Sequence, residues 1–220
     1  MATGSRTKNR TSKAEQSRAT RVKIVAAATD LFVRDGFVTT TMASIAKEAG
    51  VAVQTLYLSF GNKTAILQAA FDDALRGGVE EDIGEQDWYV QVLADPDGPA
   101  ALSLFCTRTA AVMTRAAAVY DVMRSAAADP EVGEMLAHNK KLRHDGFRAV
   151  AAALASRKGF NDELSVDDAH GILYTVLSED SCLLLVSEHG WTPRQWSDWA
   201  LRTLSSQLFG SRLDTGRVTG

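Results

Sequence analysis

Apolar residues recur at helical spacing along most of the chain, but only after a polar N-terminal segment. Residues 1–17 are rich in Ser, Thr and basic side chains and contain almost no large apolar group. They cannot bury enough surface to order themselves, so we expect a flexible arm. From Arg18 the period predicts a first helix, which ends at Asp35-Gly36 because glycine suits a helix C-cap. Its apolar positions are Ile24, Ala27, Ala28, Leu31 and Phe32.

Two short helices and a longer one are predicted next. Thr41 is a good N-cap for the second helix, and Gly50 permits the tight turn that ends it. The third helix runs from about Ala52 to Phe60, and Asn62 caps the fourth. The inward-facing residues of the second and fourth helices are Ile45, Ala46, Ala49, Ile66, Leu67, Ala70, Phe71 and Leu75.

Helical patterns continue through the rest of the chain, after a weaker acidic stretch at residues 77–87. Asp129-Pro130 is an N-cap followed by proline at the first helical position, and it predicts a long helix to about Arg157. An apolar helix follows over residues 172–186. Capping boxes precede the last two helices, formed by Ser165 with Asp168 and by Thr192 with Gln195. No strand pattern or fixed-period repeat is present in the sequence, which is therefore predicted to be all-α.

The charge is distributed unevenly along the chain. The overall formal charge is −3, but residues 1–64 carry ten Lys/Arg and four Asp/Glu, a balance of +6, against −9 for the remainder. Such a split indicates that the N-terminal end meets an anionic partner. A solvated basic tail is equally consistent with it.

Composition narrows the class of protein. The chain is 45% apolar and 23% charged, as in an ordinary soluble globular protein. Its longest run without a charged residue, residues 49–62, has 14 residues and is too short and too polar to cross a membrane. No apolar stretch of signal-peptide length follows the basic N-terminus. With only two cysteines, we expect a cytoplasmic protein that has no membrane partner.

Residues 41–60 fit a helix-turn-helix. This motif needs a short first helix, a turn without a steric clash, and apolar residues that lock the two helices at a steep angle. Two packed helices in an unrelated core would show similar spacing. The residues that meet these needs here are Ile45, Ala46, Ala49, Gly50, Val51 and Leu56.

The segment TTTMASIAKEAGVAVQTLYLSFGNKTAIL, residues 39–67, resembles the signature of the TetR family of transcriptional regulators. The resemblance is close over about residues 18–70. After the flexible arm at residues 1–17, it implies a three-helix DNA-binding domain at 18–64 and a helical domain for effector binding and dimerisation at 65–220. The matching residues are Thr41, Ile45, Ala46, Ala49, Gly50, Val51, Thr55, Leu56, Tyr57, Phe60, Lys63 and Leu67.

The sequence departs from the family pattern at three positions. Ala52 stands where Ser is frequent as the cap of the DNA-reading helix, so one N–H group loses its usual acceptor. Val53 and Leu58 stand where polar or basic side chains are common. The operator sequence therefore cannot be transferred by analogy.

Residues 51–62 contain no Lys or Arg, so the phosphate contacts must come from elsewhere. The helix N-termini at Thr41 and Asn62 present N–H groups to phosphates. The resemblance implies further phosphate contacts from the Tyr57 hydroxyl and from Lys63. The basic residues of the arm and first helix are Arg6, Lys8, Arg10, Lys13, Arg18, Arg21 and Lys23.

Base reading needs no charge. Gln54 can pair bidentately with adenine, and Thr55 is a second polar reader. Ala52 or Val53 can contact a thymine methyl group.

Each of these residues also has a purely structural interpretation. The alternative for Tyr57 is a half-buried packing residue, for Gln54 a solvated side chain, and for Lys63 a surface charge beside a helix start. The alternative for the arm is that it contacts no DNA.

The sequence contains no convincing catalytic or metal-binding constellation. His138 and His144 are six residues apart on a predicted helix and so lie on different faces, and CxxC and HExxH motifs are absent. Cys106 and Cys182 fit apolar helix cores. We therefore expect no enzyme activity, no metal and no cofactor.

The family resemblance implies that a small effector binds among the C-terminal helices. Glu179 and Asp180 lie within or beside apolar helix faces, where a charge is costly unless it is paired. Their partner is a ligand, an arginine such as Arg108 or Arg115, or a second subunit. A ligand partner would be cationic or a hydrogen-bond donor. The candidate apolar lining, which equally fits plain core, is Met113, Tyr120, Met123, Phe147 and Tyr174.

The resemblance also implies dimerisation through the last two helices. With the Leu-rich helix before it, the final helix predicts a homodimer held by residues from about 165 to 210. Its apolar side carries Trp196, Trp199, Ala200, Thr203, Leu204 and Leu208.

Together these features predict a ligand-responsive, sequence-specific DNA-binding regulator. Repression requires only that a dimer on a palindromic operator obstruct polymerase, and that a small molecule release it. One alternative is a helical enzyme or ligand carrier with an incidental helix-turn-helix. Another is a non-specific architectural protein.

Overall fold

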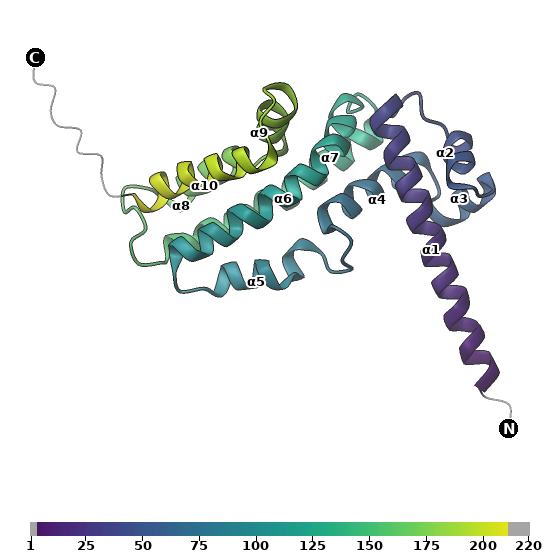
Figure 1. Ribbon diagram of the computed structural model, residues 1–220, viewed down its shortest axis with the longest axis horizontal. Helices are drawn as coiled ribbons and strands as arrows, with labels where there is room; N and C mark the ends of the chain where they lie inside the picture. Colours follow the sequence, from purple (N-terminus) through teal and green to yellow (C-terminus); the bar gives the residue numbers. More distant parts are fainter. Residues whose placement is uncertain (1–3, 211–220) are drawn as a thin grey trace, which may run out of the picture. The chain divides into compact units, whose positions relative to one another are not determined.

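The computed structural model describes residues 4–210, with side chains from residue 14 onward, and this part of the chain is helical without any strand (Figure 1). The all-α prediction is confirmed. The elements are α1 (Gly4–Asp35), α2 (Met42–Ala49), α3 (Val53–Phe60), α4 (Lys63–Arg76), η1 (Ile83–Glu85), α5 (Asp87–Ala94), α6 (Gly98–Ser125), α7 (Pro130–Ala155), α8 (Val166–Val176), α9 (Glu179–Cys182), η2 (Leu183–Glu188) and α10 (Pro193–Phe209).

The helices fall into two compact units. The first lies within Met1–Asp73 and Val119–Leu136, and the second within Ala74–Ala118 and Ala137–Gly220. Helices α4, α6 and α7 each contribute residues to both units. The first unit contains the helix-turn-helix, and the second contains the C-terminal helices.

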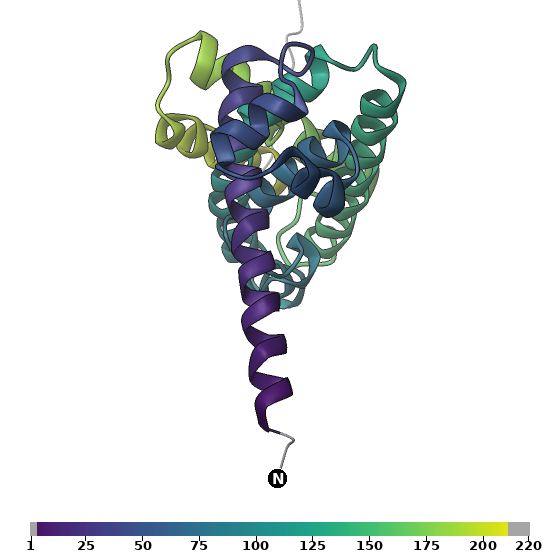
Figure 2. The ribbon, with the colours of Figure 1, turned by 90° about the vertical axis from the view of Figure 1, so that its right-hand side faces the viewer.

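Helix α1 begins at Gly4, well before the Arg18 start that apolar periodicity predicted. Figure 2 shows it as one continuous helix. Residues 14–19 are all exposed, so burial does not hold these turns. The helix propensity of Ala, Glu, Gln and Arg supports them instead. A search for an apolar stripe misses such a segment, so the predicted helix start at Arg18 was wrong. The flexibility of the arm stays a prediction.

The core of the first unit is built from the faces that the sequence predicted to point inward. The most buried side chains of α1 to α4 are Ile24, Ala28, Phe32, Ile45, Leu56, Ile66 and Leu67, none of which is exposed. Ala49 and Val51 are only half-buried. The apolar lock of the helix-turn-helix is therefore centred on Ile45 and Leu56.

The apolar side of α10 packs inside its own chain. Trp196, Ala200, Leu204 and Leu208 have no exposed surface and belong to the core of the second unit, together with residues of α5 to α9. These four of the six residues predicted for the dimer face belong instead to the core of the second unit, whereas Trp199 and Thr203 are only partly buried. A homodimer through residues 165–210 stays a prediction.

The predicted helix over residues 172–186 is interrupted. Helix α8 ends at Val176, and Leu177 has non-helical angles (φ −104°, ψ 52°). The buried Ser178 side chain accepts a hydrogen bond from the backbone N–H of Ser181 and so starts α9 as a new helix. A serine hydroxyl competes in this way with continuous helical bonding. The short α9 passes directly into η2, a π-helical segment.

One stretch in the described part of the chain, Val166–Glu188, is long and apolar enough to cross a membrane by length and composition alone. Ala169, Leu173, Leu177 and Cys182 on this stretch are buried in the core of the second unit. The core helix of a folded domain passes the same test, so the observation is weak evidence for a membrane span.

Leu204→Ala is expected to destabilise the chain by about 2–5 kcal/mol, because it leaves a cavity in a closed core. Urea unfolding followed by circular dichroism measures the change. Leu142→Ala, at a side chain that is 58% exposed, is the matched control and should change stability by less than about 0.5 kcal/mol. Equal effects of the two changes would contradict this assignment of the core.

Ala52→Ser is expected to stabilise the chain by about 0.5–2 kcal/mol. Ala52 has extended N-cap geometry (φ −72°, ψ 144°) but no side-chain acceptor for the first turn of α3. Thermal and urea unfolding test the gain. Ala43→Ser, at an exposed position inside α2, controls for serine itself and should slightly lower stability.

Candidate nucleic-acid interface and effector site

A left-handed turn joins α2 to α3. Gly50 has φ 66° and ψ 37°, and its N–H donates to the Lys47 carbonyl while the N–H of Val51 donates to the Ala46 carbonyl. These two bonds close the end of α2, and the backbone angles favour glycine because it has no Cβ. The predicted turn at Gly50 is confirmed.

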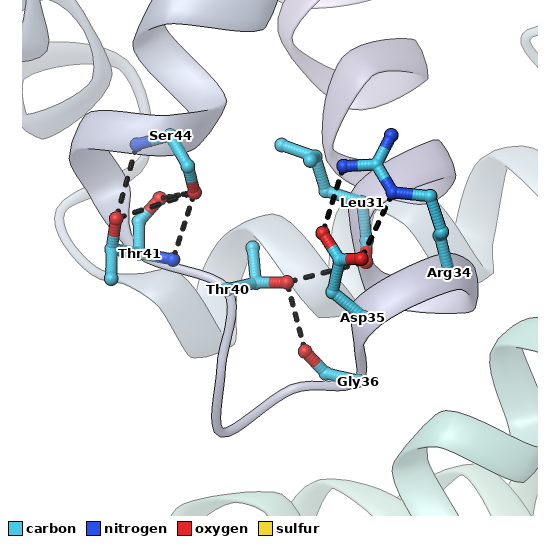
Figure 3. A network of polar contacts seen from close by, with 7 residues as sticks. All are labelled: Leu31, Arg34, Asp35, Gly36, Thr40, Thr41 and Ser44. Carbon is cyan, nitrogen blue, oxygen red and sulfur yellow. Dashed lines mark hydrogen bonds and ion pairs between the residues drawn. The ribbon is translucent and has the colours of Figure 1, made fainter.

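A polar network holds the loop between α1 and α2 (Figure 3). The Thr41 side chain accepts from the Ser44 N–H at 3.0 Å, and the Thr41 N–H donates to Ser44 Oγ at 3.0 Å, so the two residues form a capping box. The buried Thr40 hydroxyl donates to the Gly36 carbonyl at 2.8 Å. The predicted cap at Thr41 is confirmed, whereas the role of Thr40 was not foreseen.

A surface ion pair lies beside this loop (Figure 3). Arg34 donates two hydrogen bonds to the Asp35 carboxylate, at 2.9 and 2.8 Å, and these bonds lower the pKa of Asp35. The side chains of Arg34 and Asp35 are 64% and 34% exposed, so this surface pair at the end of α1 contributes little to stability.

The outer face of α3 points to solvent. Gln54 is exposed, and Val53, Tyr57 and Leu58 have 38%, 54% and 83% of their surface exposed. Thr55 is half-buried. Tyr57 is about half exposed, which fits a half-buried packing residue as well as a residue that faces DNA. The face therefore offers one amide, one phenol and two apolar side chains to a partner.

Lys63, at the start of α4, is bound inside the first unit. Its ammonium donates to the carbonyls of Phe37 (2.6 Å) and Thr40 (2.9 Å) and lies 4.1 Å from the centre of the Phe37 ring. Burial lowers its pKa, since it removes solvation from the charged form. Two of its three N–H donors are thus used, and Lys63 fastens the loop before α2 to α4.

Asn62 caps α4, as predicted. Its Oδ1 accepts from the Ala65 N–H at 2.8 Å, and its Nδ2 donates to Glu131 at 3.3 Å. The side chain is therefore committed to the helix end, which leaves the exposed N-terminus of α4 as the group that a phosphate can approach.

Arg21 on α1 was assigned to phosphate binding, but it contacts the C-terminal end of α3. Its guanidinium donates to the Ser59 carbonyl and lies 4.1 Å from the centre of the Phe60 ring. The residue fastens α3 to α1. Lys23 is exposed on α1. The side chains of Arg6, Lys8, Arg10 and Lys13 lie outside those that the structure describes.

The predicted effector residues do not all fall in one unit. Met113 and Phe147 are buried in the core of the second unit, with Tyr174 partly buried against it. Tyr120 and Met123 are buried in the first unit. The apolar pattern could not separate the two cores, because α6 supplies residues to both.

Glu179 is buried and paired with Arg143 of α7, whereas Asp180 is exposed. Neither of the two arginines suggested by the sequence pairs with Glu179. Arg108 is exposed, and Arg115 donates to the carbonyls of Ala74 and Leu75. Pairing within the protein removes the reason to expect a cationic ligand.

The signal for Arg143 was present in the sequence but was not used. Arg143 lies on the apolar stripe of α7, where its neighbours at helical spacing are Leu136, Phe147, Val150 and Leu154. Its guanidinium also lies 4.3 Å from the centre of the Tyr174 ring.

The described residues include no group of three or more His, Cys, Asp or Glu side chains that could hold a metal ion. Both cysteines are buried, and burial raises the pKa of the Cys106 thiol to about 12. The thiolate is the reactive form of cysteine, so this thiol is inert at neutral pH.

Comparisons with known proteins agree with this geometry. Residues 24–70 match the family model for bacterial regulatory proteins of the tetR family. No curated protein sequence is a significant match to the chain.

Several solved structures share the fold. NalD from Pseudomonas aeruginosa, the secondary repressor of the MexAB-OprM multidrug efflux pump, is 18% identical with a TM-score of 0.66, over 90% of this chain and 100% of that one. FadR from Bacillus subtilis, in complex with stearoyl-CoA, is 18% identical with a TM-score of 0.66, over 84% and 98%. A transcriptional regulator from Saccharomonospora viridis, in complex with choline, is 14% identical with a TM-score of 0.66, over 89% and 100%.

At these identities the structures establish the fold, and the family model establishes the kind of DNA-binding domain. The chain thus carries, over residues 24–70, a DNA-binding domain that matches the tetR family of bacterial regulatory proteins, and the helical fold that continues from it is that of these solved structures.

Proposed function

We propose that the protein is a transcriptional repressor that binds a palindromic operator as a homodimer and is released by a small-molecule effector. The observation that carries this proposal is the solvent-facing side of α3, held by a confirmed helix-turn-helix inside the segment that matches the family model. We assign DNA binding to residues 18–64, and effector binding and dimerisation to residues 65–220. Such a regulator works in the cytoplasm.

In this proposal α3 enters the major groove and reads bases without any charged side chain. The exposed Gln54 pairs with adenine, and Val53 or Ala52 contacts a thymine methyl group. Thr55 is half-buried, so only part of its side chain is open to the groove. Leu58 adds an exposed apolar contact that the sequence analysis did not assign.

Phosphate binding falls to groups around α3. The exposed Tyr57 hydroxyl and the helix N-termini that follow Thr41 and Asn62 provide neutral donors. Lys63 keeps one free N–H donor, but its bonds to the α1–α2 loop make it mainly a positioning residue. Full positive charges come from α1.

Exposed apolar surface between residues 165 and 210 supports the proposed dimer. Leu184 is 56% exposed, and Ile172, Val176, Trp199 and Leu201 are only partly buried by their own chain. Two-fold pairing sets two recognition helices about 34–36 Å apart, which matches one turn of DNA.

The structural neighbours support a ligand-responsive regulator but do not select the ligand. FadR was solved with stearoyl-CoA and the Saccharomonospora protein with choline, two molecules of unlike chemistry. The chemical class of the effector must therefore be inferred from the residues of this chain.

Base reading and phosphate binding should respond differently to mutation. Gln54→Ala is expected to weaken operator binding by about 1–3 kcal/mol, because it removes a bidentate base contact, while binding to scrambled DNA and the salt dependence stay unchanged. Tyr57→Phe should weaken binding to both DNAs. Titrations at several salt concentrations, on a site obtained by binding selection from random DNA, measure these effects.

Deletion of residues 1–17 serves as the comparison. It should weaken binding to both DNAs and reduce the salt slope by about one for each lost phosphate contact. A selection that enriched no sequence would contradict the proposed function. An equal loss on both DNAs for Gln54→Ala would contradict only the division between the two kinds of contact.

Leu184→Asp is expected to convert the dimer into a monomer and to weaken operator binding strongly, because it places a charge in the proposed interface. Sedimentation at micromolar protein concentration gives the mass. Leu142→Asp, at a similar exposure of 58% on α7, is the matched control and should remain dimeric. A monomeric wild-type protein would contradict the proposed dimer.

A further inference from the structure

A buried ion pair joins α7 to the start of α9 in the second unit. The side chains of Arg143 and Glu179 are 9% and 4% exposed. Burying two charges is costly, and a pair of this kind seldom stabilises a fold more than apolar side chains of similar size would. The pair therefore calls for an explanation other than stability.

Hydrogen-bond donors at this pair are not fully used. Arg143 Nε is buried and has no hydrogen-bond partner among the residues that the structure describes. The same holds for the buried Nε2 atom of His170 on α8. A guanidinium carries five N–H donors in a planar fork, and buried donors are normally satisfied. At least one buried donor of Arg143, its Nε–H, is therefore open to an acceptor that the described residues do not supply.

Aromatic rings surround these polar groups. The Arg143 guanidinium lies on the face of Tyr174, whose ring contacts Phe147 with a centroid distance of 5.9 Å. The Phe147 ring in turn contacts Phe105 at 5.1 Å. His170 lies 5.6 Å from Tyr174. A ligand bound to Arg143 would therefore place its polar group at the guanidinium and its apolar part beside aromatic side chains.

The two partners of the ion pair differ in how firmly they are held. Arg143 lies within α7, a helix of 26 residues, and stacks on Tyr174. Glu179 is the first residue of α9, a helix of four residues that follows the break at Leu177-Ser178 and leads into the π-helical η2. Glu179 is therefore the partner that can leave. A ligand that replaces Glu179 must itself be an acceptor for a guanidinium.

We propose that the effector is a small amphipathic carboxylate, with an apolar or aromatic body, whose carboxylate binds Arg143 in place of Glu179. The exchange releases the start of α9, and this change in the second unit is what lowers DNA affinity. Carboxylates match the guanidinium fork in geometry as well as in charge. This inference rests on the proposed function, because it names the effector class for the same regulator.

Competition between ligand and Glu179 gives the inference a distinctive signature. In the wild-type protein the ligand binds only to the fraction of molecules in which Glu179 has left Arg143, which weakens its apparent affinity by that fraction. Glu179→Gln removes the competing charge and should tighten carboxylate binding by about tenfold or more. An ion pair with a merely structural role would give the opposite result or none.

Calorimetric titration tests this with probes that differ only in the head group. The probes are 4-phenylbutyrate, its amide 4-phenylbutanamide and the amine 4-phenylbutylamine, with octanoate, octanamide and octylamine as an aliphatic series. We expect the carboxylate of at least one series to bind more tightly than its amide and amine. Arg143→Gln should weaken that binding by about tenfold or more.

Arg148→Gln is the matched control, because Arg148 lies on the same helix and pairs with Asp167 at the surface. It should leave carboxylate binding unchanged. If Arg143→Gln does not fold by circular dichroism, Glu179→Gln still decides the question, since it keeps both Arg143 and the shape of the side chain. Equal binding of acid, amide and amine, no carboxylate binding in either protein, or no gain in Glu179→Gln would overturn the inference.

Operator binding of the same proteins separates this inference from the proposed function. The effective carboxylate should weaken operator binding of the wild-type protein and not of Arg143→Gln. A protein that selects no DNA sequence but binds carboxylates through Arg143 refutes the regulator and keeps the ligand site. A protein that binds its operator, but shows no preference for carboxylates, keeps the regulator and refutes the ligand class.

Discussion

The direction in which α3 presents its outer face depends on the backbone turn at Gly50. Its left-handed conformation reverses the chain directly after α2, and Ile45 and Leu56 then close the angle between the helices by burial. A side chain at Gly50 would strain the turn, and a polar residue at Leu56 would open the lock. Gln54 and Tyr57 are exposed because burial of Leu56 turns one side of α3 towards α2 and leaves the opposite side in solvent.

Positive charge in this domain serves the structure as much as the ligand. Arg21 binds the carbonyl end of α3, and Lys63 binds two carbonyls of the loop before α2. Each cation donates hydrogen bonds to backbone carbonyls that have no backbone N–H partner at a helix end or in a loop. Arg21 thereby holds the C-terminal end of α3, and Lys63 holds the loop before α2. This arrangement fits the proposal that α3 reads bases without Lys or Arg, because Arg21 and Lys63 help to fix its position while its neutral side chains stay exposed.

The second unit uses a buried charge in a different way. Arg143 and Glu179 lie beside aromatic side chains as a buried pair, which stabilises a fold no more than apolar side chains of similar size would, and the carboxylate belongs to a four-residue helix beside a break. Short helical segments beside such breaks open more easily than long packed helices, and a ligand that favours the open form shifts the population towards it. The interruption at Ser178 and the ion pair therefore have to be considered together.

The sequence by itself determined the all-α class, the helix-turn-helix, the caps at Thr41 and Asn62 and the inward positions of α1 to α4, because these depend on local periodicity and on hydrogen bonds between close neighbours. Tertiary structure decided what depends on distant partners. Only packing could show that Leu204 lies in the core of its own chain, that Lys63 and Arg21 bind carbonyls, and that Glu179 pairs with Arg143 and not with Arg108 or Arg115. Charge and hydropathy patterns indicate that a side chain requires a partner or burial. The three-dimensional arrangement of the helices determines which residue that partner is.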